Sequence, residues 1–182
     1  MGLRRRFMKK LLIVVDFQND FVSGSLGFQG ADLLDDVIAN KIKAYHKNKD
    51  DVIFTLDTHY SDYLSTNEGQ HLPVEHCQKG TNGHELYDKV KSLSEDALRF
   101  EKPTFPSLEL ANYLTKHNYK EVELCGLVSN ICVLSNAVMV KSALPNAQII
   151  VDAKATDSFD KDLHEKSLDV MSGLHIKVIN RT

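Results

Sequence analysis

Short apolar runs recur along this 182-residue chain, and longer segments of mixed polarity separate them. A strand inside a parallel sheet is covered on both faces, so its sequence is nearly continuously apolar instead of alternating. This pattern predicts strands at residues 11–15, 51–56, 121–128, 147–151 and 175–179, with a weaker one at 97–100.

Two of the segments between these strands have the apolar spacing of a helix. In segment 31–48, five apolar residues fall on one helical face, namely Leu33, Leu34, Val37, Ile38 and Ile42. Segment 130–145 is apolar on most sides, which predicts a buried helix that ends near Pro145. Both segments lie between predicted strands, as the connections of a parallel sheet require.

Two further helices are indicated by residues that can cap them. Ser107 precedes segment 108–117, and Asp160 precedes segment 161–173. Side-chain oxygens at this position accept hydrogen bonds from the first free amides of a helix. Strands and helices therefore alternate along the chain, which predicts a three-layer α/β/α fold with a mostly parallel central sheet.

The length suits a single domain, which we place at residues 8–182. Residues 1–7 are interpreted as an N-terminal extension or leader, with Met8 as an alternative start. The apolar run 11–15 stops at Asp16 and is too short for a signal peptide or a membrane helix. We therefore expect a cytoplasmic protein with no membrane partner.

Charge and cysteine content narrow the function further. The formal net charge is −3, so no strong positive field favours nucleic acid as a partner. The three cysteines are an odd number without the spacing of a disulfide framework, which indicates a reducing compartment. We expect a small-molecule partner, and the sequence leaves a homo-oligomer open.

Reactive side chains follow four of the predicted strands, where ligands bind in such sheets. These residues are Asp16, Asp57 with His59, Lys102 and Cys132. A lone cysteine is more often part of a core than a nucleophile, but the meeting of these groups at one edge favours catalysis. Lys102 and a helix N-terminus would favour the thiolate of Cys132, and Asp16 would serve as general base and acid.

The long segment 57–83 carries a second set of candidate residues. Asp57, His59, Glu68 and His76 offer carboxylate and imidazole ligands, which suit divalent Zn, Mn or Fe. His71 and Cys77 compete for the same role. The alternative is a polar surface loop with solvated histidines.

Six segments of the chain together resemble the isochorismatase-like cysteine hydrolases, and within them the nicotinamidases. The segments are DFQNDF at 16–21, DTH at 57–59, PVEHC at 73–77, KGTNG at 79–83, EKPTF at 101–105 and GLVSNICV at 126–133. The resemblance extends from Lys10 to about Ile179. It implies the isochorismatase-like α/β fold and an amidohydrolase acting on linear amides.

The resemblance also implies roles for particular residues. The catalytic trio would be Asp16, Lys102 and Cys132, and a cis peptide would join Leu127 to Val128. The backbone amides of Val128 and Cys132 would form the oxyanion hole. The implied reaction is the conversion of nicotinamide to nicotinate and ammonia through a Cys132 thioester.

The implied metal site holds one divalent ion, with Zn as the first expectation and Mn or Fe as alternatives. Its ligands would be Asp57, His59, Glu68 and His76, and Phe21 would form one wall of the substrate site. Many members carry a large aromatic residue just before the Pro-x-x-His stretch. This chain has no Trp and has Leu72 and Pro73 there.

Three alternative functions remain at this point. The first is a related amidase acting on an acyclic carbamoyl or ureido amide, and the second is an isochorismatase-type hydrolase. The third is a phosphoacceptor receiver domain, which also has acidic residues after two strands and a Lys-Pro pair, here Lys102–Pro103. It would leave Cys132 and the histidines without a role, so we disfavour it.

Overall fold

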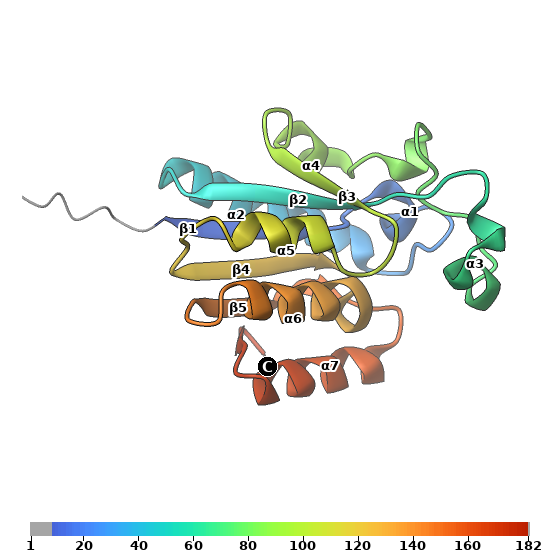
Figure 1. Cartoon of the computed structure of the whole chain (residues 1–182). Coiled ribbons are helices and arrows are strands. Elements are labelled where there is room, and N and C mark those ends of the chain that lie inside the picture. The colour runs from blue at the N-terminus through green and yellow to red at the C-terminus, as the bar shows by residue number, and fades with distance from the viewer. Residues whose placement is uncertain (1–8, 182) are drawn as a thin grey trace, which may run out of the picture.

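In the computed structural model, residues 9–181 are described, and they form one six-stranded sheet with helices on both faces (Figure 1). All strand pairings are parallel, in the order β3-β2-β1-β4-β5-β6. The strands are β1 (Lys10–Val15), β2 (Asp51–Asp57), β3 (Leu98–Lys102), β4 (Glu121–Leu127), β5 (Gln148–Asp157) and β6 (Lys177–Ile179). Each predicted strand is confirmed, including the weak one, and β5 runs six residues further than expected.

Two helices cover one face of the sheet and three cover the other. α2 (Leu34–Lys47) and α4 (Asp88–Ser92) pack on the first face. α5 (Leu108–Leu114), α6 (Leu134–Ala143) and α7 (Lys161–Gly173) pack on the second face, in front of the sheet in Figure 1. The predicted three-layer α/β/α fold is therefore confirmed.

The central strand β1 explains why the strand sequences are continuously apolar. Leu12 and Val14 are fully buried under the layer that contains α2. Leu11, Ile13 and Val15 are fully buried under the opposite layer. Since both faces of β1 exclude water, no position along it can be polar without losing hydration.

The predicted helix starts are confirmed in detail. The side chain of Ser107 accepts a hydrogen bond from the Leu110 amide, and that of Asp160 accepts one from the Leu163 amide. The helix expected at 31–48 begins with a 3-10 turn over Ala31–Leu33 before α2. The helix expected at 130–145 is α6 preceded by a separate turn, and its outer side is exposed, with Val138 at 42%.

Three short helices were not predicted: α1 (Asn19–Val22), α3 (Asn67–His71) and α4. Two of them flank the candidate chemistry, since α1 follows Asp16 and α3 carries Glu68. None of the helices within residues 9–181 is long and apolar enough to cross a membrane. The interpretation of residues 1–7 and the domain start at residue 8 fall outside the described part of the chain.

Candidate active site

The carboxylate of Asp16, the ammonium of Lys102 and the thiol of Cys132 meet at the carboxyl ends of β1, β3 and β4. Lys102 Nζ lies 2.6 Å from Asp16 Oδ2, 3.2 Å from Asp57 Oδ1 and 3.7 Å from Cys132 Sγ. Thr55 donates a hydrogen bond of 2.6 Å to Asp16 Oδ1, which orients the carboxylate. All of these side chains are buried. The three residues predicted from separate strand ends therefore form one cluster.

Burial shifts the pKa values of two of these groups. It raises the pKa of the Asp16 carboxyl, and Lys102 only partly opposes this. Burial also raises the pKa of the Cys132 thiol well above its usual range, and the ammonium of Lys102 does not reverse the shift. We expected Lys102 and a helix N-terminus to favour the thiolate. Desolvation of the buried thiolate thus works against the nearby positive charge of Lys102.

The backbone around Asp16 is held in an unusual conformation. Asp16 has a φ of 44°, in the left-handed region that non-glycine residues rarely adopt. Gly126 of β4 has a φ of 110°, and a Cβ atom there would collide with the carbonyl oxygen of Val15. The glycine lets β4 approach β1 closely at the residue before Asp16. This close approach brings the ends of both strands to the same point.

The rest of the DFQNDF segment holds the long loop in place. Gln18 Nε2 donates to the carbonyl oxygens of Asp57 and His84, at 2.9 Å each, and Gln18 Oε1 accepts from the Asp57 amide at 2.8 Å. Asp20 Oδ2 accepts from the Cys77 amide at 2.7 Å. Gln18 and Asp20 thereby fix both ends of the segment that carries the candidate metal ligands.

Asp57, His59, Glu68 and His76 form a second cluster beside the first. Each offers one ligand atom, and the four atoms lie within 4.8 Å of one another. From Asp57 Oδ2, His59 Nε2 is 3.0 Å away and His76 Nε2 is 3.2 Å away. From Glu68 Oε1, the same two nitrogens are 3.6 and 3.9 Å away.

These spacings fit a single bound ion. Tetrahedral ligands at ~2.0–2.2 Å from a metal lie roughly 3.3–3.6 Å from one another. His76 Nδ1 lies 2.7 Å from the Val74 carbonyl oxygen, which can only accept, so Nδ1 carries the proton. His76 Nε2 is therefore the ring nitrogen left to bind a metal, as in metal-binding imidazoles whose second nitrogen is hydrogen-bonded. His71 is exposed, and its Nδ1 bonds the Asn67 carbonyl oxygen. His71 lies outside this set of four.

The turn that carries Cys132 joins β4 to α6. Leu127 and Val128 are joined by a cis peptide, as the resemblance implied, and one π-helical turn follows at Ser129–Val133. His164 Nδ1 of α7 lies 2.8 Å from the hydroxyl oxygen of buried Ser129. The turn is thus tied to the neighbouring helix three residues before the thiol.

Both clusters open into one cavity of about 900 Å³. Its lining includes Cys132, Asp57, Glu68, His76 and the predicted wall residue Phe21. The ring of Phe21 packs edge-on against His76, with 5.6 Å between ring centroids. Among the described residues that line this cavity there is no Lys or Arg, and apolar side chains predominate.

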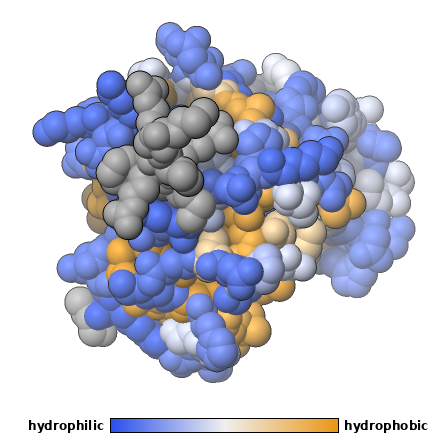
Figure 2. Space-filling model, turned by 60° about the vertical axis from the view of Figure 1, so that its left-hand side comes forward, coloured by the Kyte–Doolittle hydropathy of each residue, from blue (hydrophilic) through white to orange (hydrophobic). Residues whose placement is uncertain are grey.

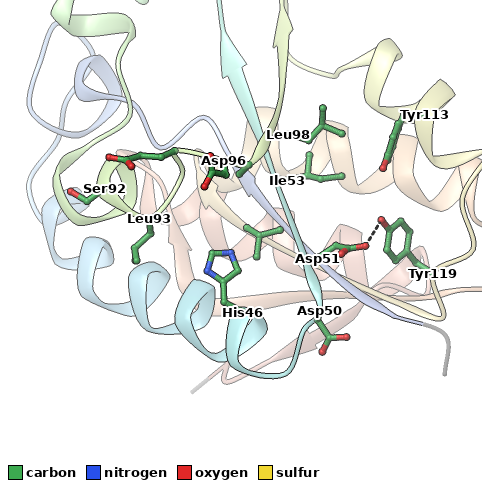
Figure 3. Close-up of a pocket in the computed structure, with 13 residues that line it drawn as sticks. His46, Asp50, Asp51, Ile53, Ser92, Leu93, Asp96, Leu98, Tyr113 and Tyr119 are labelled. Carbon is green, nitrogen blue, oxygen red and sulfur yellow. Dashed lines mark hydrogen bonds between the residues drawn. The ribbon is translucent and has the colours of Figure 1, made fainter.

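A second cavity of about 600 Å³ lies at the other end of the sheet, near the amino ends of β2 and β3 (Figure 3). Carboxylates and two tyrosines line it, and the Tyr119 hydroxyl donates to Asp51 at 2.9 Å. Figure 2 shows that the side facing the amino ends of the strands is mostly hydrophilic, with smaller hydrophobic groups. None of the predicted site residues lines this cavity.

Sequence reasoning therefore named the side chains that cluster here and missed the residues that hydrogen-bond to them and to their loops. Thr55, Gln18, Asp20, Ser129 and His164 each make a buried or half-buried hydrogen bond in the site. Gln18 and Asp20 lie inside the DFQNDF segment at 16–21, so their place in that motif could have marked them. Thr55, Ser129 and His164 are ordinary residue types whose partners are distant in sequence, and no local signal marks them.

Comparisons with known proteins agree with this fold. The family model described as "Isochorismatase domain" matches residues 10–182. The crystal structure of nicotinamidase/pyrazinamidase PncA from Bacillus subtilis is 29% identical, covers 94% of this chain and 99% of its own, and has a TM-score of 0.84. Pyrazinamidase of Pyrococcus horikoshii in complex with zinc is 25% identical (95% and 99% covered, TM-score 0.83). N-carbamoylsarcosine amidase from Thermoplasma acidophilum is 26% identical (94% and 95% covered, TM-score 0.78).

Proposed function

The chain belongs to the isochorismatase family and is a hydrolase of that family, and we propose that it deamidates a small neutral carboxamide. Nicotinamide, converted to nicotinate and ammonia, is the first candidate. The observation that carries this proposal is the Cys132 thiol, 3.7 Å from Lys102 Nζ in a cavity shared with the four candidate metal ligands.

The charge of the cavity favours a neutral substrate. Isochorismate and N-carbamoylsarcosine both carry carboxylates, and sites for such groups commonly use Arg or Lys. No Lys or Arg side chain lines this cavity within the described residues, so no cationic side chain is at hand to pair with a substrate carboxylate. Nicotinamide and pyrazinamide carry no charge at neutral pH, so they need no such partner.

The three clustered residues would divide the chemistry between them. Asp16 takes the proton from the Cys132 thiol as the sulfur attacks the amide carbon, and then gives it to the leaving nitrogen. Ammonia leaves and a thioester remains. Asp16 next takes a proton from water, the resulting hydroxide attacks the thioester, and the proton returns to the Cys132 sulfur. The Val128 and Cys132 amides would hold the oxyanion.

Lys102 would keep this cycle aligned. It contacts both Asp16 and Cys132, and the surrounding carboxylates hold the pKa of its ammonium well above the usual value despite its burial. It therefore stays positive throughout the cycle. It would stabilise each state in which negative charge lies on Asp16 or on the sulfur.

Asp57, His59, Glu68 and His76 would hold one divalent ion, with zinc as the first choice for two imidazoles and two carboxylates. When bound, the ion would supply a Lewis acid for a pyridine nitrogen or a water molecule. Zinc is also present in the similar P. horikoshii pyrazinamidase structure. Phe21 would pack against the flat face of the substrate ring.

Ammonia release from three amides tests the proposal. We expect measurable release from nicotinamide and pyrazinamide and much slower release from benzamide, which lacks the ring nitrogen. Equal rates on benzamide and nicotinamide would remove any role for that nitrogen. Inactivity on all three, with good activity on an acyclic ureido or carbamoyl amide, would favour the alternative function of an amidase for acyclic amides. The similarity to N-carbamoylsarcosine amidase keeps that candidate in place.

A further inference from the structure

Four apolar side chains surround the outer part of the cavity that holds Cys132. Leu26, Leu72, Phe105 and Phe159 come from four different loops, and all of them line this cavity. Phe159 is 61% exposed and Phe105 is 41% exposed, so water reaches them in the free protein. We call these four side chains the apolar rim.

The Phe159 side chain of the rim is connected to the hydrophobic core through a second aromatic ring. The ring of Phe159 packs edge-on against Phe28, with 6.5 Å between ring centroids. Phe28 packs in turn against the hydrophobic core, and Lys161 Nζ lies 5.5 Å from its ring centroid. A side chain that is already held in place loses little conformational freedom when a ligand contacts it. The exposed ring of Phe159 is therefore a ready binding surface.

The cavity is larger than a single aromatic carboxamide requires. Its volume of about 900 Å³ is near the upper end of the ~300–1,000 Å³ that pockets for drug-sized ligands occupy. One ring with one carboxamide, placed against Cys132 and Phe21, would leave the rim in contact with water. Burying that apolar surface would be favourable for any substrate that reaches it.

We propose that the apolar rim is a second substrate subsite. It accepts an apolar substituent on the ring of a neutral carboxamide, at ring carbon 5 in nicotinamide, which neighbours neither the carbon that bears the carboxamide nor the ring nitrogen. This inference rests on the proposed amide hydrolysis and extends its substrate class. Because the rim side chains are apolar and no Lys or Arg lines the cavity within the described residues, a carboxylate substituent would lose hydration there without a cationic partner and is disfavoured.

A series of substituted nicotinamides tests the subsite with the full-length enzyme. The series carries hydrogen, methyl, propyl, phenyl or carboxylate at ring carbon 5, and kcat/KM is measured by ammonia release. We expect kcat/KM to rise about two- to fourfold for each methylene that becomes buried. The carboxylate compound should fall below nicotinamide itself.

Two matched variants assign the effect to the rim. Phe159→Ala should lower the ratio of kcat/KM for the propyl compound to that for nicotinamide by about three- to tenfold. The ratio cancels any general loss of active enzyme. Val170→Ala removes another apolar side chain that is more than half exposed, from α7 and outside the cavity lining. It should leave the ratio unchanged.

The outcomes separate the two proposals. Hydrolysis of nicotinamide with no gain from the apolar substituents overturns the subsite and leaves the proposed function standing. Absence of ammonia from every compound overturns the proposed function and the subsite with it. The remaining explanation is that the rim is a contact between copies of the chain, and sedimentation of both variants tests it. If Phe159→Ala dissociates an oligomer and leaves the ratio unchanged, the rim is a contact between copies of the chain and the subsite is overturned.

Discussion

Lys102 and Lys41 each contact two carboxylates while largely shielded from water, yet their surroundings differ. Lys102 lies beside Asp16, Asp57 and the thiol of Cys132, and the last two line the large cavity. Asp16 Oδ2 is 2.6 Å from Lys102 Nζ but makes no well-aligned hydrogen bond within the described residues. This group of charges is incompletely satisfied.

The group around Lys41 is complete. Lys41 of α2 pairs with Glu123 Oε1 of β4 at 2.7 Å and with Asp152 Oδ2 of β5. The Tyr45 hydroxyl donates to Glu123 Oε2 at 2.8 Å, and the Lys154 amide donates to Asp152 Oδ1 at 3.0 Å. Each carboxylate oxygen therefore has a partner, and none of these residues lines the large cavity.

The comparison separates charges that hold the fold from charges that are available for chemistry. Shielding from water and ion pairing are common to both groups, so neither property identifies an active site by itself. What distinguishes the Lys102 group is the unsatisfied oxygen of Asp16 together with neighbours, Asp57 and Cys132, that line the large cavity. In a fully satisfied network such as that of Lys41, every carboxylate oxygen already has a hydrogen-bond or ion-pair partner, so none is available to a substrate.

The largest effect should follow removal of the sulfur at the cavity. Cys132→Ala should lower ammonia release by about 10⁴-fold or more, since no other group of the cluster can form the thioester. Cys125→Ala is the matched control, because Cys125 is fully buried on the opposite face of the sheet. It should retain most activity. Comparable losses in both variants would show that the core, and not the nucleophile, had been damaged.

The same substitution at the two lysines should produce opposite results. Lys102→Met should lower kcat/KM by about 10²–10⁴-fold, the range typical of positioned groups in acid–base catalysis. Lys41→Met should keep activity within about twofold. It should lower the free energy of unfolding by about 2–4 kcal/mol, because it leaves two carboxylates shielded without their cation. Steady-state kinetics and urea unfolding of both variants measure this contrast, and a reversed pattern would contradict it.

Much of the fold could be predicted because its signals are local. The runs at 11–15 and 51–56 are apolar without interruption, and Ser107 and Asp160 stand directly before their helices. The short helix α3 could not be predicted, because five residues are too few to establish a helical period. It is held in place by its Thr66 cap, which accepts a hydrogen bond from the Gly69 amide.

The site was predictable only as far as residue type is informative. A thiol, a lysine and a carboxylate at strand ends are conspicuous, and the structure brings them together. The hydrogen bond from Thr55 to Asp16 spans 39 positions, and that between Ser129 and His164 spans 35. Threonine and serine are too common for such partners to be chosen from sequence. The catalytic roles themselves remain predictions.

The candidate metal ligands beside Lys102 should bind an ion, which the satisfied group around Lys41 should not. Protein prepared without chelators should hold about one divalent ion per chain, because four ligand atoms face one point. His59→Ala should lose most of that metal and of its stabilising effect against heat. His71→Ala is the control, since His71 lines the same cavity outside the cluster. Elemental analysis decides between them, and loss from His71→Ala alone would mean that the ligand set is wrong.

The smallest effect should be a change in how stability depends on pH. Burial alone would raise the pKa of Asp152 in the folded protein. Hydrogen bonding and attraction to Lys41 outweigh burial, so this pKa is lowered. The contribution of Asp152 to stability is therefore present above the ordinary carboxyl pKa of about 3.9 and is lost as pH falls through the lower folded value. Asp152→Asn should be less stable than the parent by about 1–3 kcal/mol near pH 7.

That difference should shrink as the pH is lowered below about 4, because the parent then loses the same charge that the variant lacks. Urea unfolding at several pH values between neutrality and the acid transition measures it. Asp162→Asn is the control, since Asp162 pairs with Lys166 on the exposed side of α7. Water screens that pair, so its removal should leave the pH dependence unchanged. A constant difference between Asp152→Asn and the parent at all pH values would mean that Asp152 contributes through packing. The network of Lys41, Glu123 and Asp152 would then stabilise the fold through shape and not through charge.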